Sequence, residues 1–312
     1  MVHNSSLREK SKYLRITVFI CTYNRGDLIN KTLKSIIVNQ TRKPDEIIVV
    51  NGGGENNCQK ILEKWQKKFL SLKIIQTKNK NLAASRNIGL PHCSGDLIIQ
   101  TDDDARPFPD WIDRIVEAHE KFPEAGVIGG DVIDASGNSF LSNIADATTF
   151  PHHDATCEVC SVPGVNSSYK RKVIEHIGEY DENLFRGEDV DYNWRAIQKG
   201  WKILYIPNIK VTHVHRATWK GLFHQHYMYG RAHYLVRKKW PEMYSHYPLD
   251  IQSLWHVIKW ISSWVYIPFL DAKNKAKRLN AHPNGFEILM MGIINIFNRI
   301  GTTVEWCFDK ND

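Results

Sequence analysis

The sequence lacks several features that would place it in a specialised protein class. Its six cysteines are scattered along 312 residues, at positions 21, 58, 93, 157, 160 and 307, which indicates a reduced compartment rather than a disulfide scaffold. Residues 1–15 form a polar, basic tail with no apolar stretch, so we expect no secretory signal and a cytoplasmic location. A hydrophobic content of 42% is ample for a globular core.

A complete set of zinc-binding cysteines is also missing. Only Cys157 and Cys160 form a CxxC pair, with His152 and His153 nearby. A structural zinc site needs four ligands held together, and no second CxxC completes the set. A plain loop is therefore the favoured interpretation over a zinc site.

Positive charge is in excess, but no nucleic-acid-binding motif accompanies it. The net charge of +7 and pI of about 9.0 are compatible with nucleic acid, anionic lipid or phosphate-bearing substrates. The lysines of the first half are dispersed at helix-surface spacing, so we expect no nucleic-acid partner. A second basic group, Lys273, Lys275, Lys277 and Arg278, directly follows an apolar segment, which is a pattern typical of membrane surfaces.

The first 130 residues alternate short apolar runs with helical patterns. Strands are predicted near 16–21, 46–50, 72–76, 96–100 and 127–131, and helices near 27–39, 58–69, 82–89 and 109–122. This alternation predicts an α/β fold, a Rossmann-like and mainly parallel sheet flanked by helices.

The pattern between residues 131 and 240 is less regular. We expect a long polar loop over 134–161, strands at 163–169, 202–205 and 209–214, and helices at 171–177, 188–199 and 217–240. The last of these segments is aromatic and basic, so it could wall an acceptor cleft or belong to the core.

Polar side chains follow three of the predicted strands. Thr22 to Arg25 follow the first strand, Asn51 follows the second, and Asp102 to Asp104 follow the fourth. Ligands collect at the carboxyl ends of strands in such sheets, so these residues are expected to converge. Three adjacent carboxylates repel one another unless a cation neutralises them, and oxygen ligands at this density suit Mg²⁺ or Mn²⁺. A solvated acidic turn is the alternative.

A second group of carboxylates opens the helix predicted at 188–199. Glu188 and Asp189 follow Gly187, where helix capping alone could explain one of them. A carboxylate near a bound hydroxyl could instead act as a general base. Asp191 falls on a different face and is expected to be solvated.

Two histidines end the last predicted strand. His213 and His215 share one face of that strand, so either could be a further metal ligand, or both could be packed or surface residues.

Six ordered motifs carry a resemblance to a known family. ITVFICTYNR, IIVVNGG, NLAASRNIGL, GDLIIQTDDDARPFPDW, GVNSSYKRKVIEHIGEYDE and GEDVDYNWRAIQKGW with the later VTHVH lie between residues 16 and 216. In this order they resemble glycosyltransferase family 2, the inverting nucleotide-sugar transferases of GT-A fold. The resemblance implies transfer of a sugar from a nucleotide-diphosphate sugar, with a divalent metal, to the hydroxyl of a glycan or a lipid-linked acceptor.

The resemblance also implies roles for particular residues. Residues 16–131 would be the nucleotide-sugar-binding half and 132–240 the acceptor-binding, catalytic half. Nucleotide-sugar contacts would come from Thr22, Tyr23, Arg25, Asn51, Arg86, Asp102 and Asp103, metal contacts from Asp102, Asp104 and His213 with His215 as the fallback, and catalysis from Asp189 as base beside Glu188. The triple Asp leaves the register of the DxD pair open. Asn51 stands where many members carry Asp, so UDP is only the favoured nucleotide.

Residues 249–312 form a separate helical extension in this interpretation. Residues 251–270 have an amphipathic, Trp-rich pattern that suits a helix lying in a lipid headgroup layer. Residues 286–308 have an apolar run too short to cross a bilayer. Peripheral contact of 251–308 with the inner face of the cell membrane and packing on protein both remain open.

Two other functions stay as alternatives. One is a nucleotide-sugar-binding scaffold without activity, which loss of the Glu-Asp pair would have favoured. The other is a sugar nucleotidyltransferase, which usually has a Gly-rich loop after its first strand, whereas CTYNRGD lacks that glycine density.

Overall fold

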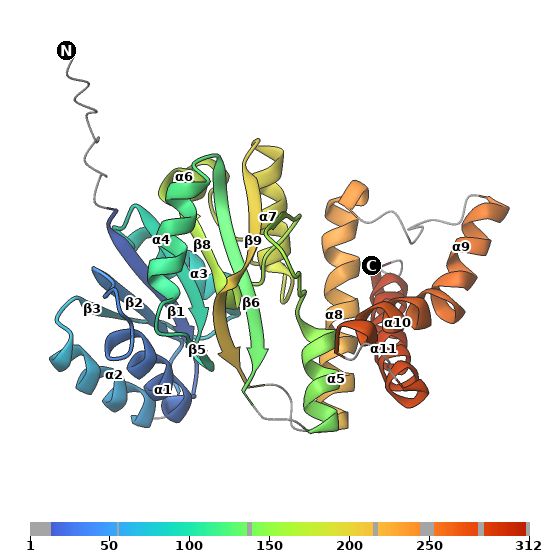
Figure 1. The fold of residues 1–312 in the computed structure, drawn as a ribbon, viewed down its shortest axis with the longest axis horizontal. Helices are drawn as coiled ribbons and strands as arrows, with labels where there is room; N and C mark the ends of the chain where they lie inside the picture. The colour runs from blue at the N-terminus through green and yellow to red at the C-terminus, as the bar shows by residue number, and fades with distance from the viewer. Residues whose placement is uncertain are drawn as a thin grey trace, which may run out of the picture.

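The computed structural model describes residues 14–54, 56–135, 139–214, 218–243, 253–279 and 284–309. Figure 1 shows an α/β part and, beside it, a group of helices formed by α5 and the C-terminal third of the chain. His215 and Ile251, which the sequence analysis considered, lie outside the described residues.

One mixed sheet forms the centre of the α/β part. Within the described residues its strand order is β3-β2-β1-β4-β8-β6-β9-β5, with β7 paired to β9. The strands are β1 (Ile16–Thr22), β2 (Glu46–Asn51), β3 (Leu72–Gln76), β4 (Leu97–Asp102), β5 (Ala105–Pro107), β6 (Ala125–Asp134), β7 (Cys157–Glu158), β8 (Ser167–Lys170) and β9 (Lys202–His213). The pairs among β3, β2, β1 and β4 are parallel, as predicted for these alternating segments. Strand β8 is antiparallel to both β4 and β6, so the sheet is mixed beyond β4.

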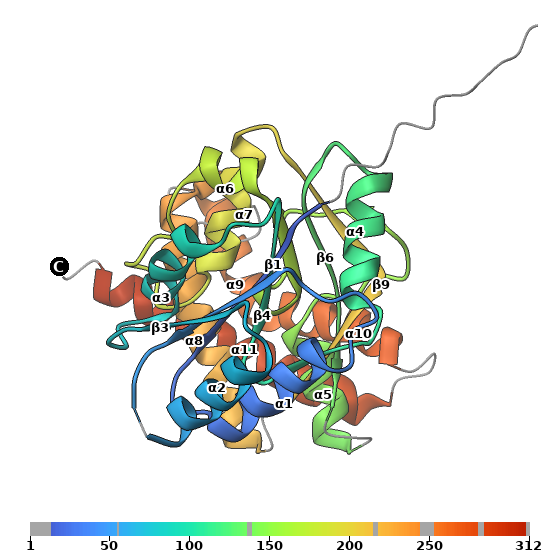
Figure 2. The same ribbon diagram turned by 90° about the vertical axis from the view of Figure 1, so that its left-hand side faces the viewer.

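Helices cover both faces of this sheet, and two further helices, α5 and α8, lie beside it. Together these helices are α1 (Gly26–Ile37), α2 (Asn56–Lys68), α3 (Leu82–Gly89), α4 (Trp111–Lys121), α5 (Phe140–Thr149), α6 (Arg171–Ile177), α7 (Glu188–Gln198) and α8 (Trp219–Lys239), with short 3₁₀ turns η1 (Leu90–His92), η2 (Gly164–Asn166) and η3 (Pro241–Met243). Apolar side chains of α1, α2 and α4 pack in one core, and those of α3, α6 and α7 pack in a second core. Figure 2 shows α3 and α4 on opposite sides of β1 and β4. The predicted α/β fold is confirmed.

Three predicted segments differ from the structure. The loop expected over 134–161 contains α5, which begins after Ser139, whose side chain accepts a hydrogen bond from the Ser142 N–H. The strand expected at 163–169 starts as the turn η2 and becomes extended only at Ser167. The two strands expected at 202–205 and 209–214 are one strand, β9, which pairs with β6 through a register shift.

Three helices follow α8, namely α9 (Leu254–Val265), α10 (Ile267–Leu279) and α11 (Gly285–Asp309). Apolar side chains of α10 and α11 form a third core with those of α5 and α8, and α9 packs against α10 and α11. Helices α8 and α11 approach very closely, because a Cβ on Gly230 would lie 1.8 Å from the Asn298 carbonyl oxygen and one on Gly301 would lie 1.9 Å from that of Tyr227. In the described part of the chain, no helix is both long and apolar enough to cross a membrane.

Candidate active site

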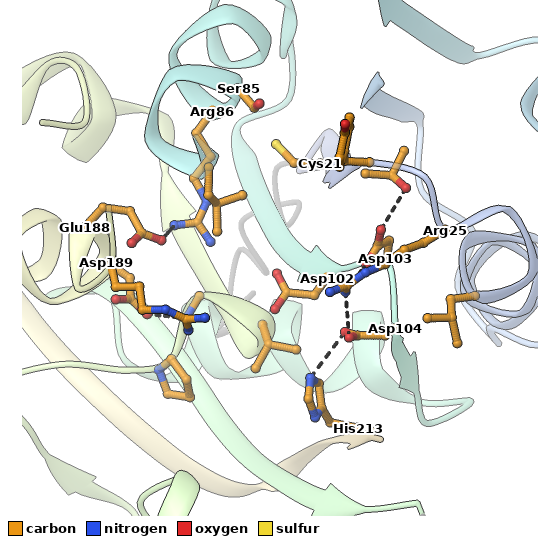
Figure 3. A pocket seen from close by; sticks show the side chains of 18 of the residues that line it. Cys21, Arg25, Ser85, Arg86, Asp102, Asp103, Asp104, Glu188, Asp189 and His213 are labelled. Atoms are coloured by element: carbon orange, nitrogen blue, oxygen red, sulfur yellow. Dashed lines mark hydrogen bonds and ion pairs between the residues drawn. The ribbon is translucent and has the colours of Figure 1, made fainter. Parts of the chain in front are cut away.

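A cavity of about 700 Å³ opens at the carboxyl ends of β1 and β4. Most of the site residues predicted from the sequence line it. They are Thr22, Tyr23, Arg25, Arg86, Asp102, Asp103, Asp104, Glu188, Asp189 and His213. Figure 3 shows the Arg86–Glu188 pair on one side of this cavity and His213 with Asp104 on another. Convergence at the strand ends, as predicted, produces one site from segments far apart in the chain.

The three consecutive aspartates point in different directions. Asp103 is buried and accepts a hydrogen bond of 2.7 Å from the Thr22 hydroxyl. The Arg25 guanidinium contacts both Asp103, at 3.0 Å, and Asp104, at 2.8 Å. Asp103 is therefore held against β1, and Asp102 and Asp104 are the pair that can share a ligand. This geometry favours Asp102 and Asp104 as the DxD pair.

Asp102, Asp104 and His213 form a cluster with metal-ligand geometry. One ligand atom from each residue lies within 4.8 Å of the others, and the His213 Nε2 lies 3.2 Å from an Asp104 carboxylate oxygen. Burial, with the negative charge of Asp104 next, raises the pKa of Asp102 to about 6. Two carboxylates and an imidazole, with charge this crowded, fit Mg²⁺ or Mn²⁺.

Within the described residues this cluster is the only group of three or more such side chains. It does not include Cys157 or Cys160, of which Cys157 begins the short strand β7.

The opposite wall is built on a buried ion pair. The Arg86 Nη1 lies 2.7 Å from a Glu188 carboxylate oxygen, and both residues are buried. The guanidinium also lies over the Tyr180 ring, which is stacked on Tyr192 with centroids 3.8 Å apart. Burial raises the pKa of Glu188 to about 7, against the positive charge of Arg86. Glu188 is thus engaged by Arg86, and Gly187, in the left-handed conformation at φ 74°, occupies the N-cap of α7.

Asp189 is fixed by backbone groups rather than by another side chain. Its carboxylate accepts hydrogen bonds from the N–H of Gly164, at 3.0 Å, and of Val190, at 2.9 Å. Gly164 is a residue that the sequence analysis missed. A Cβ there would lie 2.5 Å from the Arg86 Nη2, so glycine leaves room for the ion pair as well as supplying the N–H. The Pro163-Gly164 dipeptide was a turn signal that could have marked this position.

The expectation of a solvated Asp191 is wrong. Its side chain is buried and contacts the Arg195 Nε at 3.0 Å, the Lys239 Nζ at 2.8 Å and the Trp240 indole N–H at 2.8 Å. Asp191 does lie on a different face of α7, but that face is covered by the end of α8. Its role is therefore to hold α8 against α7.

Asn51 lies behind the cavity wall and does not line the cavity. It is opposite Thr22 in the β1–β2 pairing and is only 3% exposed. Its amide nitrogen donates weakly to Gln59, at 3.3 Å, whereas its carbonyl oxygen accepts no hydrogen bond from the described residues. Tyr23, in contrast, is exposed at the rim.

Helix α8 and the segment before α7 complete the cavity. Gln225 and Tyr229 from α8 and Phe185 and Arg186 from the segment line it. Other aromatic residues of α8 face the helical core instead, among them Phe223, whose ring stacks on Phe297. Neither Arg186 nor Gln225 was among the site residues predicted from the sequence.

A family model described as "Glycosyl transferase family 2" matches residues 17–178. This chain belongs to glycosyl transferase family 2. The match spans half of the chain and contains the aspartate triplet and Arg86, whereas Glu188 and Asp189 lie ten and eleven residues beyond its end. The resemblance inferred from the sequence motifs is confirmed, and the chain is a glycosyltransferase of this family.

Relatives of this glycosyltransferase include enzymes with different substrates. The glucosyl-dolichyl phosphate glucuronosyltransferase of Haloferax volcanii is 26% identical over 67% of this chain and 75% of its own length. The poly-beta-1,6-N-acetyl-D-glucosamine synthase of Staphylococcus aureus is 24% identical over 82% of this chain but only 63% of its own length. The solved mannosyltransferase PcManGT from Pyrobaculum calidifontis, in complex with GDP-Man and Mn²⁺, superposes with a TM-score of 0.66 at 16% identity, covering 96% of this chain and 89% of that one. This likeness confirms the GT-A fold.

Proposed function

We propose that this glycosyltransferase moves a sugar from a nucleotide-diphosphate donor to an acceptor hydroxyl, with Mg²⁺ or Mn²⁺ and with inversion at the anomeric carbon. The observation that carries the proposal is the presence of two groups on the walls of one cavity. These are the Asp102, Asp104 and His213 cluster and the Asp189 carboxylate held by two backbone N–H groups.

Each group has a distinct part in the proposed reaction. Asp102, Asp104 and His213 would hold the metal, whose positive charge would stabilise the leaving diphosphate. Asp189 takes the proton of the attacking hydroxyl, and its backbone hydrogen bonds keep the carboxylate aimed at that position. The buried Arg86–Glu188 pair fixes the wall beside it, and Arg86 adds positive charge near the diphosphate.

The nucleotide base is proposed to be uracil, which the family resemblance favours. Asn51 is not assigned to the base, because its side chain is buried and does not line the cavity, although its carbonyl oxygen has no hydrogen-bond partner among the described residues. The solved mannosyltransferase carries GDP-Man, so guanine is the alternative to test.

A thermal-shift panel tests donor class and metal together. UDP or a UDP-sugar with Mn²⁺ should raise the melting temperature more than either component alone, because a ligand selective for the folded state stabilises it. At 100 times the dissociation constant the gain is about 2.7 kcal/mol. Asp102→Asn should abolish the effect of Mn²⁺, whereas Asp110→Asn, at the half-exposed N-cap of α4, should retain it. A wild-type chain that responds to no nucleotide diphosphate with Mn²⁺ would contradict the proposal.

The same panel separates the two alternative functions. A scaffold would bind the donor without turnover, so release of nucleoside diphosphate in the presence of acceptors excludes it. A sugar nucleotidyltransferase would instead require a nucleoside triphosphate and a sugar phosphate. The family assignment already favours transfer of the sugar.

We further propose that α9 contacts the surface of an anionic membrane. Leu254, Ile258, Ile261 and Val265 form one stripe along this helix and are 77%, 48%, 51% and 67% exposed. Helix α9 contains no acidic residue, and Lys259 lies beside this stripe with its ammonium group over the Trp255 ring. An apolar stripe with a Trp and positive charge suits a helix lying in the headgroup layer, on the inner face of the cell membrane. A lipid-linked acceptor, as in the name of the Haloferax relative, would be presented there.

Vesicle sedimentation tests this contact. The wild-type chain should sediment at low salt with vesicles containing phosphatidylglycerol, and Leu254→Ser/Val265→Ser should weaken binding about 10-fold, because two apolar side chains are removed from the interface. The matched control is Val38→Ser/Leu70→Ser, which removes an exposed valine and an exposed leucine from the α/β part, at 54% and 90% exposure. A wild-type chain left wholly in the supernatant would refute the contact.

A further inference from the structure

Arg186 is a cation of the cavity that the proposed reaction does not yet use. Its guanidinium lies over the Tyr229 ring, 5.5 Å from the centroid, and lines the cavity. Among the residues that the structure describes, no carboxylate lies within ion-pair distance of it. The other two arginines of the cavity, Arg25 and Arg86, are both paired with carboxylates. Arg186 is therefore the arginine with hydrogen-bond donors left for a ligand.

Contacts with α8 hold Arg186 and the residue before it in place. The Tyr229 hydroxyl accepts a hydrogen bond of 2.8 Å from the Gln225 side chain, which orients the ring. The neighbouring residue, Phe185, lies under the guanidinium of Arg231, which in turn is 2.5 Å from Glu305 of α11. Two stacking contacts thus fasten the segment before α7 to α8. An arginine stacked on an aromatic ring presents its N–H groups edge-on, which is the geometry that binds planar or tetrahedral oxyanions.

The charge pattern around Arg186 indicates what kind of ligand it would take. Asp189, the proposed base, lies three residues further along the chain, beyond the left-handed turn at Gly187. A negative group next to Asp189 would be repelled, whereas a neutral hydroxyl would not. An acceptor with an oxyanion at one end and a hydroxyl at the other would be oriented by both residues. The oxyanion would meet Arg186, and the hydroxyl would meet Asp189.

We propose that Arg186, supported by Tyr229 and Gln225, binds an oxyanion of the acceptor, a phosphate or a carboxylate. The inference deepens the transferase proposed above and rests on it. It assigns an anionic acceptor to this enzyme and places the specificity for that acceptor in the segment between α6 and α7. Phosphate would point to a phosphorylated lipid, and carboxylate to a uronic acid of a glycan.

Three soluble probes with the same tail test the inference. Octyl phosphate, octyl glucuronide and octyl glucoside are titrated below their micelle concentrations into the full chain, by calorimetry, with and without Mn²⁺ and UDP. We expect at least one anionic probe to bind about 10- to 100-fold more tightly than the neutral glucoside, as expected for charge-assisted hydrogen bonds. The stronger of the two anionic probes distinguishes the phosphate from the carboxylate source.

Variants assign the preference to Arg186. Arg186→Gln should bind the anionic and neutral probes alike, and Arg186→Lys should keep part of the preference, because it retains charge without the planar fork. Arg114→Gln on the exposed surface of α4 lowers the net charge equally and should behave as wild type. The stabilisation of Arg186→Gln by UDP with Mn²⁺ should equal that of wild type.

Each other outcome has a definite meaning. Equal binding of all three probes by wild type, or no binding of either anionic probe, overturns the inference. A preference retained in Arg186→Gln overturns it too, and a loss of UDP binding in that variant would move Arg186 to the donor side. If the wild-type chain binds neither UDP nor any other nucleotide diphosphate, the transferase proposal fails. Nucleotide binding is measured without any probe, and probe binding is measured without any nucleotide, so the two failures can be distinguished.

Discussion

Replacing Asp189 with asparagine is expected to reduce turnover by about 10²- to 10⁴-fold and to leave nucleotide binding nearly unchanged. Asparagine keeps an oxygen that can accept the Gly164 N–H but cannot take a proton from the acceptor. The cavity should therefore keep its shape and lose its base. The Asp102, Asp104 and His213 cluster does not include Asp189, so metal binding should be unaffected.

Release of nucleoside diphosphate from the best donor of the thermal-shift panel measures this effect, with donor binding measured by calorimetry on the same samples. Asp110→Asn removes the half-exposed carboxylate at the N-cap of α4 and is the matched control. Transfer by Asp189→Asn at the wild-type rate would show that another group is the base. Equal loss of binding and turnover would show that Asp189 is structural.

Replacing Arg86 with methionine is expected to destabilise the fold by about 3–5 kcal/mol, because it leaves Glu188 buried without its cation. The loss should depend on pH. The pKa of Glu188 is already raised from 4.5 to about 7 in the folded chain, chiefly by burial, and it should rise further without Arg86. A carboxyl group with a raised pKa binds more protons in the folded state, so stability falls as pH increases above 4.5. Arg86→Met should thus be more destabilised at pH 8 than at pH 5.

Urea denaturation at several pH values measures this dependence. Arg86→Met/Glu188→Gln should regain much of the lost stability at pH 8, because the uncompensated charge is gone. Arg114→Met breaks only the exposed ion pairs of Arg114 on α4, so it should change stability by less than about 1 kcal/mol. A loss for Arg86→Met that is the same at all pH values would mean that packing on Tyr180, and not the charge of Glu188, is responsible.

The first half of the fold was predictable because its signals are local. Strands β1, β2 and β4 contain apolar runs rich in Ile or Val, and β1 and β2 are each followed by an amphipathic helix. Helix α5 was missed because its composition is rich in Ser, Thr and Asn, and only packing against the C-terminal helices gives it a buried face. Its partners lie more than 100 residues away, beyond the reach of a periodicity argument.

The site residues were predictable where charged side chains cluster at the end of a strand or the start of a helix. They were less predictable where the site depends on contacts between residues far apart in the sequence. Asp102 to Asp104 and the Glu188-Asp189 pair stood out as clustered charges. The contact between Arg86 and Glu188 joins residues 102 positions apart, so the sequence could suggest each residue but not the pair. Gly164 acts through the absence of a side chain, and Asp191 is buried only because the end of α8 covers it.

The glycine contacts between α8 and α11 connect the C-terminal helix to a wall of the cavity. Gly230 and Gly301 bring the two backbones together, and α8 carries Tyr229 and Gln225 into the cavity. Deleting residues 249–312 would strip α8 of its neighbour and disturb the acceptor wall along with any lipid contact. A shortened chain would therefore lose membrane binding and acceptor binding together. Point substitutions on the exposed side of α9 can change membrane binding alone.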